Sequence, residues 1–410
     1  MQFLKVDTLE EAREKLLKEV NSCFTKTEKI ALDAAVGRCL ASDVICPFMV
    51  PDFRRSTVDG FAVIASDTQG AGESIPVFLD IVEEVSIGKP AKKQIRSGQC
   101  AYVPTGGMLP DGADAMVMVE YTELFDETSA AVYSAVSPGR GVVQIGEDAQ
   151  KGTILLQKGT VLNAGSIGVL ASVGISEVEV FYPWRLTIVS TGDELIQPGT
   201  KRNPCEIYDV NSHAILALAR EQGMTAVETI ALEDDEVLLE QTLRRAMTVS
   251  DIVVVSGGSS QGKKDVTAQV IDRIADPGVW THGLALKPGK PAIVGMDEPS
   301  GTLLLGLPGH PVAAMMVFEL LIIWLKRKLF HEKEKLLIPA VMESNIPGAP
   351  GKTTCQTVKL IPCENGYLAR PVFGKSGLMS TLTQADGYVM VEMNREGINT
   401  GETVYVHLFS

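Results

Sequence analysis

Apolar positions near the start of the 410-residue chain have helical spacing. Residues 8–20 predict a helix in which Thr8 caps the first turn and Glu11 follows three positions later, the arrangement of a capping box. A second short helical piece is expected around residues 26–36. This first stretch is therefore predicted to be largely helical.

The pattern changes between residues 50 and 145, where Gly and Pro are frequent and apolar runs are short. Valine-rich runs of this kind predict β-strands, at 77–85, 115–124 and 130–136. Helical spacing returns at 161–174. The N-terminal part is therefore expected to be discontinuous, with a β-rich insert carried on a helical piece.

Residues 183–330 alternate between fully apolar runs and amphipathic segments. The apolar runs predict strands at 185–190, 225–232, 251–258, 291–295 and 302–309. The amphipathic segments predict helices at 211–223, 234–247 and 265–275, with a further helix after Pro311. Strands without polar alternation are typical of a parallel sheet covered on both faces, so this stretch is predicted to be an α/β domain.

After residue 335 the helical pattern stops, and short strands separated by Gly-rich turns predict a small closed β domain. The predicted fold class is therefore multidomain, α/β plus β. The expected domains are a helical N-terminal part (1–50 and 146–180), a β-rich insert (51–145), an α/β domain (181–332) and a C-terminal β barrel (333–410).

Composition narrows the possible functions. The chain has 37 basic and 51 acidic side chains, a net charge of −14, which disfavours a general nucleic-acid binder but allows an anionic ligand in a locally basic pocket. The apolar run 312–325 is interrupted by Glu319 and is too short to span a bilayer, so it predicts a buried helix. Seven cysteines without a CxxC pair, and a start without a secretory signal, favour reduced thiols in a cytoplasmic protein.

Three predicted strands of the α/β domain end in unusual loops, at 190–195, 256–265 and 306–311. Ligands of such sheets bind beyond the carboxyl ends of the strands, so we expect these loops to meet on one rim. Glycines allow backbone N–H groups to approach an oxyanion closely, and the loop at 287–291 adds Lys287 and Lys290. Ligand contacts are predicted for Gly257, Gly258, Ser259, Gly309 and His310.

Two alternatives apply to the loop at 256–265. It nearly fits a P-loop, since Gly257 and Gly262 precede Lys263, but Lys264 stands where that motif needs a hydroxyl for magnesium. A glycine-rich turn without function is the other alternative, and three such loops on one rim make it the weaker one.

Carboxylates accompany these glycines. Glu194 follows the first loop's Gly, Asp234 and Asp235 precede one helix, and Asp265 precedes another. An acid at a helix start is commonly a cap, and an acid in a turn is commonly solvated. However, magnesium takes one or two carboxylates together with phosphate oxygens and water, so Glu194, Asp234 and Asp265 are candidate ligands.

Ten strings in order along nearly the whole chain resemble the molybdopterin molybdenumtransferase family, which includes the MoeA proteins and the gephyrin E domain. They are STVDGFAV (56–63), PTGGMLPDGADAMVMVE (104–120), GED (146–148), STGDEL (190–195), DVNS (209–212), EDD (233–235), SGGSSQGKKD (256–265), KPGKP (287–291), GLPGHPVAA (306–314) and SGLMSTLTQADGYV (376–389). The chain departs from the family in the two lysines 263 and 264 and in His310, where many relatives have Asn.

The resemblance implies an α/β domain related to the molybdopterin adenylyltransferases, and a homodimer in which the insert of one subunit faces the α/β domain of the other. It implies that molybdate is inserted into adenylylated molybdopterin with release of AMP and with Mg²⁺ as cofactor. Contact with the adenylyltransferase and with molybdoenzymes would follow. The residues that inherit functional roles are Asp59, Thr105, Asp148, Glu194, Asp234, Asp265, Lys287, Lys290, Pro308 and Pro311, of which Asp59 and Thr105 would act from the partner subunit.

Two other functions stay open at this point. An adenylyltransferase that loads AMP from ATP would need only the α/β domain, so the insert and the barrel argue against it. A scaffold that retains the fold without chemistry is disfavoured by the acids and lysines at the motif positions.

Overall fold

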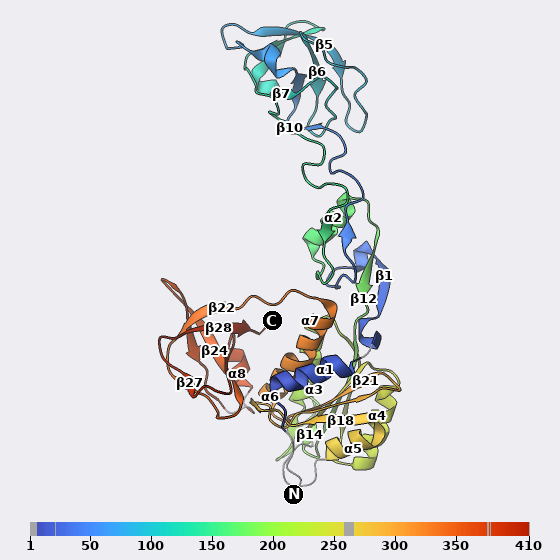
Figure 1. Cartoon of the computed structure of the whole chain (residues 1–410), viewed down its shortest axis with the longest axis vertical. Helices are drawn as coiled ribbons and strands as arrows, with labels where there is room; N and C mark the ends of the chain where they lie inside the picture. Colours follow the sequence, from blue (N-terminus) through green and yellow to red (C-terminus); the bar gives the residue numbers. More distant parts are fainter. Residues whose placement is uncertain (1–5, 21, 258–265, 375–376, 378, 410) are drawn as a thin grey trace. The chain divides into compact units, whose positions relative to one another are not determined.

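A computed structural model describes residues 6–20, 22–257, 266–374, 377 and 379–409 (Figure 1). The chain forms two compact units, each described here by itself. The first unit comprises residues 1–42, 158–164 and 177–410, and the second comprises residues 43–157 and 165–176. No helix among the described residues is long and apolar enough to cross a membrane.

The first helix confirms the prediction from the capping pattern. Helix α1 (Leu9–Glu19) is capped by the Thr8 side chain, which accepts the Glu11 N–H, while the Glu11 carboxylate accepts the Thr8 N–H. Leu9 and Leu16 on one face are fully buried in the core of the first unit. Capping and burial therefore agree on where this helix starts and how it faces.

The expected helical piece at 26–36 is wrong. Strand β1 (Thr27–Ala31) lies there, between two short 3₁₀ turns, η1 (Ser22–Thr25) and η2 (Leu32–Ala34). It pairs antiparallel with β12 (Glu177–Phe181) over five residue pairs. A short segment with no strong propensity takes the structure that its distant partner offers, which no local pattern reports.

The second unit is β-rich, as predicted for the insert. Its six-stranded sheet has the order β7 (Ala115–Met118), β4 (Gly60–Val63), β6 (Gln99–Val103), β5 (Val77–Glu84), β9 (Ser129–Val132), β8 (Thr122–Leu124). Two small ladders pair β3 (Arg55–Ser56) with β10 (Val142–Val143) and β2 (Val44–Ile45) with β11 (Ile154–Leu156). Short 3₁₀ turns η3 (Ala65–Thr68) and η4 (Val119–Tyr121) complete it, and helix α2 (Ala164–Ser172) belongs to it from residue 165 on.

The α/β part of the first unit carries a six-stranded sheet. Its order is β16 (Thr225–Leu232), β13 (Arg185–Thr191), β17 (Ile252–Gly257), β21 (Thr302–Leu307), β20 (Ile293–Asp297), β18 (Pro277–His282). The first four strands are parallel, as predicted, whereas β20 runs antiparallel to both of its neighbours, β21 and the edge strand β18. A small parallel pair, β14 (Leu195–Ile196) and β15 (Ile207–Tyr208), follows β13.

Helices cover both faces of this sheet, which explains why its strands lack polar alternation. Helices α4 (Glu236–Met247) and α5 (Val266–Ile274) pack on the face that bears Val253 and Val255. The opposite face, with Ile188 and Val254, packs against α1, α3 (Val210–Glu221) and α6 (Pro311–Phe318) (Figure 1). A π-helical turn η5 (Glu319–Ile323) joins α6 to α7 (Trp324–Phe330), so the apolar run is a buried helix, as predicted.

The C-terminal part is a closed five-stranded barrel, as predicted. Its strands follow the order β24 (Thr353–Cys363), β25 (Gly366–Pro371), β22 (Ile338–Met342), β28 (Thr403–Leu408), β26 (Gly387–Val391), and β26 pairs back with β24. The pair β23 (Ile346–Pro347) and β27 (Gly397–Ile398) and the short helix α8 (Ser380–Gln384) lie outside it. Strand β19 (Leu286–Lys287) adds to β24 in parallel, so the α/β part and the barrel share a ladder.

Candidate functional site

The strands β13, β17 and β21 are neighbours in the sheet, so the loops after them leave from one edge; of the loop at 256–265 the structure describes Ser256 and Gly257 alone. Their last residues are in register, with Ser190 opposite Ser256 and Ser256 opposite Leu307. All three therefore release their loops at the carboxyl edge, where ligands of α/β sheets bind.

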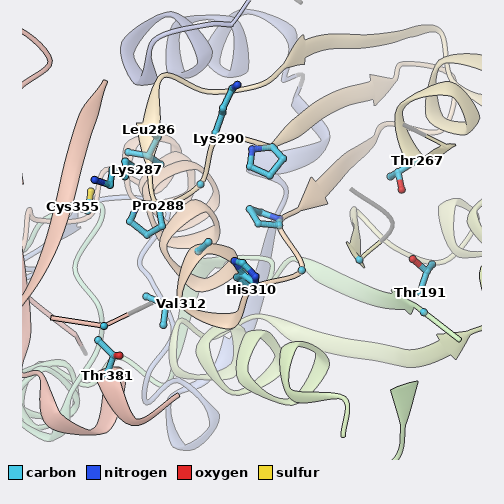
Figure 2. Close-up of a pocket in the computed structure, with 18 of the residues that line it drawn as sticks. Thr191, Thr267, Leu286, Lys287, Pro288, Lys290, His310, Val312, Cys355 and Thr381 are labelled. Carbon is cyan, nitrogen blue, oxygen red and sulfur yellow. The ribbon is translucent and has the colours of Figure 1, made fainter. Parts of the chain in front are cut away.

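A pocket of about 1790 Å³ opens at this rim (Figure 2). The rim contributes the stretch 191–194, Gly257 and the turn Pro308–His310, and the barrel contributes residues of β24 and of the segment 372–374. Figure 2 shows Thr191 and Thr267 at one end, Cys355 and Thr381 at the other, and His310 between them. The pocket is thus long enough to expose one ligand to both parts of the first unit.

The loop at 287–291, which carries Lys287 and Lys290, is held by backbone hydrogen bonds near both of its ends. Its ends are joined by the Leu284 N–H, which donates to the Lys290 carbonyl at 2.8 Å. Ala285 accepts the barrel's Thr353 N–H at 2.9 Å and donates to the carbonyl of Asp7 at 2.7 Å. Both ammonium-bearing side chains, Lys287 and Lys290, line the pocket and are exposed. The loop therefore presents two positive charges from a backbone that is held in place.

The lining of the pocket also contains acidic side chains. Glu194 and Asp234 line the pocket, and the Asp193 carboxylate accepts the Asp234 N–H at 3.0 Å. Partial burial, followed by the charges of Asp193 and Glu194, raises the pKa of the Asp234 carboxyl. The three carboxylates repel one another, and a bound cation would relieve that repulsion.

Two buried hydroxyls also line the pocket. Thr191 ends β13 and Thr267 lies in the first turn of α5, and Figure 2 shows both at the same end. Within the described part of the chain, neither Oγ1 atom has a hydrogen-bond partner although both side chains are more than nine-tenths buried. Buried hydroxyls are normally paired, so these two are available to a bound group.

Comparisons with known proteins cover the chain from end to end. Residues 7–174 match the MoeA N-terminal region (domain I and II), residues 187–327 match a probable molybdopterin binding domain, and residues 339–409 match the MoeA C-terminal region (domain IV). The molybdopterin molybdenumtransferase of Haemophilus influenzae is 31% identical over 98% of each chain. The chain belongs to the MoeA family.

Other relatives agree with this membership. The molybdopterin molybdenumtransferase of Bacillus subtilis is 31% identical, over 93% of this chain and 90% of its own. The crystal structure of a molybdopterin biosynthesis MoeA protein from Pyrococcus horikoshii OT3 superposes with a TM-score of 0.83 at 30% identity, over 99% of this chain and 100% of that chain. The multidomain fold is therefore the MoeA fold, and its α/β part is the domain shared with the MogA-like proteins.

Most residues that the MoeA resemblance singled out in the α/β part gather at the pocket. Those that line it are Glu194, Asp234, Gly257, Lys287, Lys290, Pro308, Gly309 and His310. Pro311 is the first residue of α6, directly after the pocket-lining turn. Gly258, Ser259 and Asp265, with the lysines 263 and 264, lie outside the described residues. The Asp235 carboxylate accepts the Leu238 N–H at 2.8 Å. Asp235 is therefore a helix cap, which is the alternative given above for acids at a helix start.

The remaining three predicted MoeA residues belong to the second unit. There the Asp59 carboxylate accepts the Thr105 N–H at 2.8 Å, so two exposed residues join the strings 56–63 and 104–120. Asp148 is exposed on a separate connection, and its N–H donates to the Val50 carbonyl at 3.0 Å. The structure thus joins Asp59 to Thr105 directly.

Sequence reasoning missed the barrel's contribution to this MoeA pocket. Gln356 and Thr357 both donate from their side chains to the carbonyl of Val372, at 2.9 Å each, and so fix the backbone that carries Phe373. All four residues line the pocket, and 64% of the Phe373 surface is exposed. No motif marks these positions; the pairing of β24 with β25, in which Val358 lies opposite Pro371, brings Thr357 beside the segment that follows β25.

Proposed function

We propose that this MoeA-family protein is a molybdopterin molybdenumtransferase, which inserts molybdate into adenylylated molybdopterin and releases AMP. One observation carries the proposal. The described ends of the three strands, the turn after β21 and the loop that carries Lys287 and Lys290 converge on one large pocket, in a chain that family members match over nearly its whole length.

The chemistry of the pocket suits this substrate. Adenylylated molybdopterin combines anionic phosphate groups with two heteroaromatic rings, and molybdate is itself an anion. Lys287, Lys290 and the hydroxyls of Thr191 and Thr267 offer cationic and hydrogen-bonding groups to the oxyanions. The exposed ring of Phe373 offers an apolar face for a planar heterocycle.

Cleavage of the link between molybdopterin and the adenylate needs stabilisation of developing negative charge, which the two lysines supply. A covalent route through the pocket's thiol is disfavoured. Burial raises the pKa of Cys355 to about 12, so this thiol is protonated at neutral pH and is a poor nucleophile.

Magnesium is part of the proposal. Glu194 and Asp234 are hard oxygen donors at the phosphate-binding rim, and their mutual repulsion fits a site that receives a divalent cation. Among the described residues, no group of three or more His, Cys, Asp or Glu side chains is arranged around a common point, so substrate oxygens and water would complete the shell. When bound, the cation would neutralise charge on the phosphate link.

The assembly and the cellular setting are also proposed from the resemblance. In a homodimer, Asp59 and Thr105 would act from the insert of the second subunit, and Asp148, which follows the insert in sequence, would also contribute. A cytoplasmic location, and contacts with the adenylyltransferase and with recipient molybdoenzymes, would complete this setting.

The first experiment incubates purified protein with adenylylated molybdopterin and measures AMP release with and without molybdate. We expect release that depends on molybdate. A parallel incubation with molybdopterin and ATP tests the adenylyltransferase alternative, and AMP loading there, without molybdate-dependent release, would replace the proposal.

A variant then tests the rim. Glu194→Gln should lower molybdate-dependent AMP release by at least about tenfold, because an amide cannot replace the carboxylate charge at the rim. Glu228→Gln is the matched control, since Glu228 is exposed on β16 of the same sheet, pairs with Arg245 and does not line the pocket. Equal activities of the two variants would show that the Glu194 carboxylate has no role in the reaction.

A further inference from the structure

The first turn of α3 reaches all three strands that carry the rim. Asp209 caps this helix by accepting the Ser212 N–H at 3.1 Å, and its carboxylate also accepts the Ser190 hydroxyl of β13 at 3.1 Å. The Ser190 and Ser212 hydroxyls lie 2.7 Å apart. These bonds tie α3 to β13 alone.

Asn211 extends the connection to the other two strands. Its amide nitrogen donates to the Ser256 hydroxyl of β17 at 2.7 Å and to the Gly309 carbonyl at 2.9 Å. Gly309 lies in the turn after β21, which lines the pocket, whereas Asn211 itself does not line it. A single buried amide thus joins the end of one rim strand to the pocket turn of the next.

The Gly309 turn lies between β21 and α6. It follows Pro308 and leads into His310, the residue before α6, whose carbonyl accepts the Ala314 N–H at 2.9 Å. The carbonyl of Gly309 faces inward to Asn211, which leaves the His310 side of the turn toward the pocket. Asn211 therefore adds a side-chain link between the end of β17 and this turn, beyond the last ladder pair Ser256–Leu307.

We propose that Asn211 is a positioning residue, which fixes the Pro308–His310 turn against β17 so that the rim matches its anionic ligand. The inference rests on the proposed function, because its assay uses the same substrate. Both N–H groups of the amide are used, so a side chain of the same shape without donors would release the turn. Asp is that side chain, and its charge would also repel the Gly309 carbonyl.

The test compares Asn211→Asp with Ser212→Ala in molybdate-dependent AMP release. Ser212 is also buried in the same helical turn, but its hydroxyl pairs with Ser190. For Asn211→Asp we expect KM for adenylylated molybdopterin to rise about tenfold with a smaller change in kcat. For Ser212→Ala we expect KM within about twofold of the parent.

A pH profile separates positioning from general damage to the fold. When the new carboxyl of Asn211→Asp is protonated it regains one donor, so the ratio of its kcat/KM to that of the parent should rise as the pH falls. A variant that melts at a lower temperature but keeps the parent KM and a flat ratio would overturn the inference. A parent without molybdate-dependent AMP release would instead end the proposed function, and the inference with it.

Discussion

Asp234 and Asp235 are adjacent in sequence and do opposite things. The charge of Asp234 is disfavoured by partial burial and by Asp193 and Glu194, whereas Asp235 satisfies a backbone N–H at the start of α4. The sequence suggested one explanation, helix capping, for both. Both acids line the pocket, but which of them caps α4 depends on where the helix begins, and a boundary of one residue is below what local patterns resolve.

A pair of substitutions checks this division. Because folding raises the pKa of Asp234, its charge destabilises the folded state above the ordinary carboxyl range, and the penalty disappears once the group is protonated in both states. Asp234→Asn should therefore raise the free energy of unfolding slightly at neutral pH, and the gain should fade on acidification. Denaturant unfolding at several pH values measures it.

The neighbouring substitution is the control. Asp235→Ala removes a cap and should cost about 1 kcal/mol of unfolding free energy. If Asp234→Asn were destabilising at neutral pH, its carboxylate would be structural, and its assignment to a cation or substrate site would lose its support.

At the scale of elements, composition and spacing located most strands and helices, because burial on both faces of the α/β sheet leaves an unmistakable apolar pattern. The failures are elements whose structure depends on a distant partner. Strand β1 exists because β12 pairs with it, and the antiparallel edge strand β18 depends on β20. The edge from which the strand-end loops leave was predictable because parallel strands of an α/β sheet end on the same side, whereas the barrel's pocket residues depend on the pairing of β24 with β25, which no motif marks.

Gly60 belongs to the STVDGFAV string of the insert and is the first residue of strand β4. A Cβ atom at Gly60 would lie 1.9 Å from the Val117 carbonyl oxygen of the neighbouring strand β7. Gly60→Ala should therefore force β4 and β7 apart and destabilise the insert by about 2 kcal/mol or more. Thermal unfolding followed by circular dichroism measures the loss.

The matched control lies in the same unit. A Cβ at Gly72 would meet no atom within 4 Å, so Gly72→Ala should leave the unfolding temperature nearly unchanged. Equal stability of the two variants would mean that the contact between β4 and β7 relaxes freely, and that the glycine of this motif serves another purpose.

At the scale of the whole molecule, the protein's charge acts on an anionic ligand in opposite directions at long range and inside the pocket. A net charge of −14 repels an anion at long range, while Lys287 and Lys290 attract it inside the pocket. Salt screens both effects over a Debye length of about 8 Å at physiological ionic strength. Contacts within hydrogen-bonding distance should dominate the affinity, so AMP should bind more weakly to the parent as salt rises.

Removing the two lysines should reverse that dependence. In Lys287→Gln/Lys290→Gln, the remaining field is repulsive, so AMP affinity should fall at least about tenfold at low salt and then recover as salt is added. Lys201→Gln/Arg202→Gln is the control, because it loses the same two charges from an exposed segment outside the pocket and should keep the parent's salt dependence. Titration calorimetry between about 0.05 and 0.3 M salt measures the slopes. Parallel slopes in all three proteins would show that the anion is held elsewhere. The two variants carry the same net charge, so only the loss of a cationic site that contacts AMP would give their slopes opposite signs.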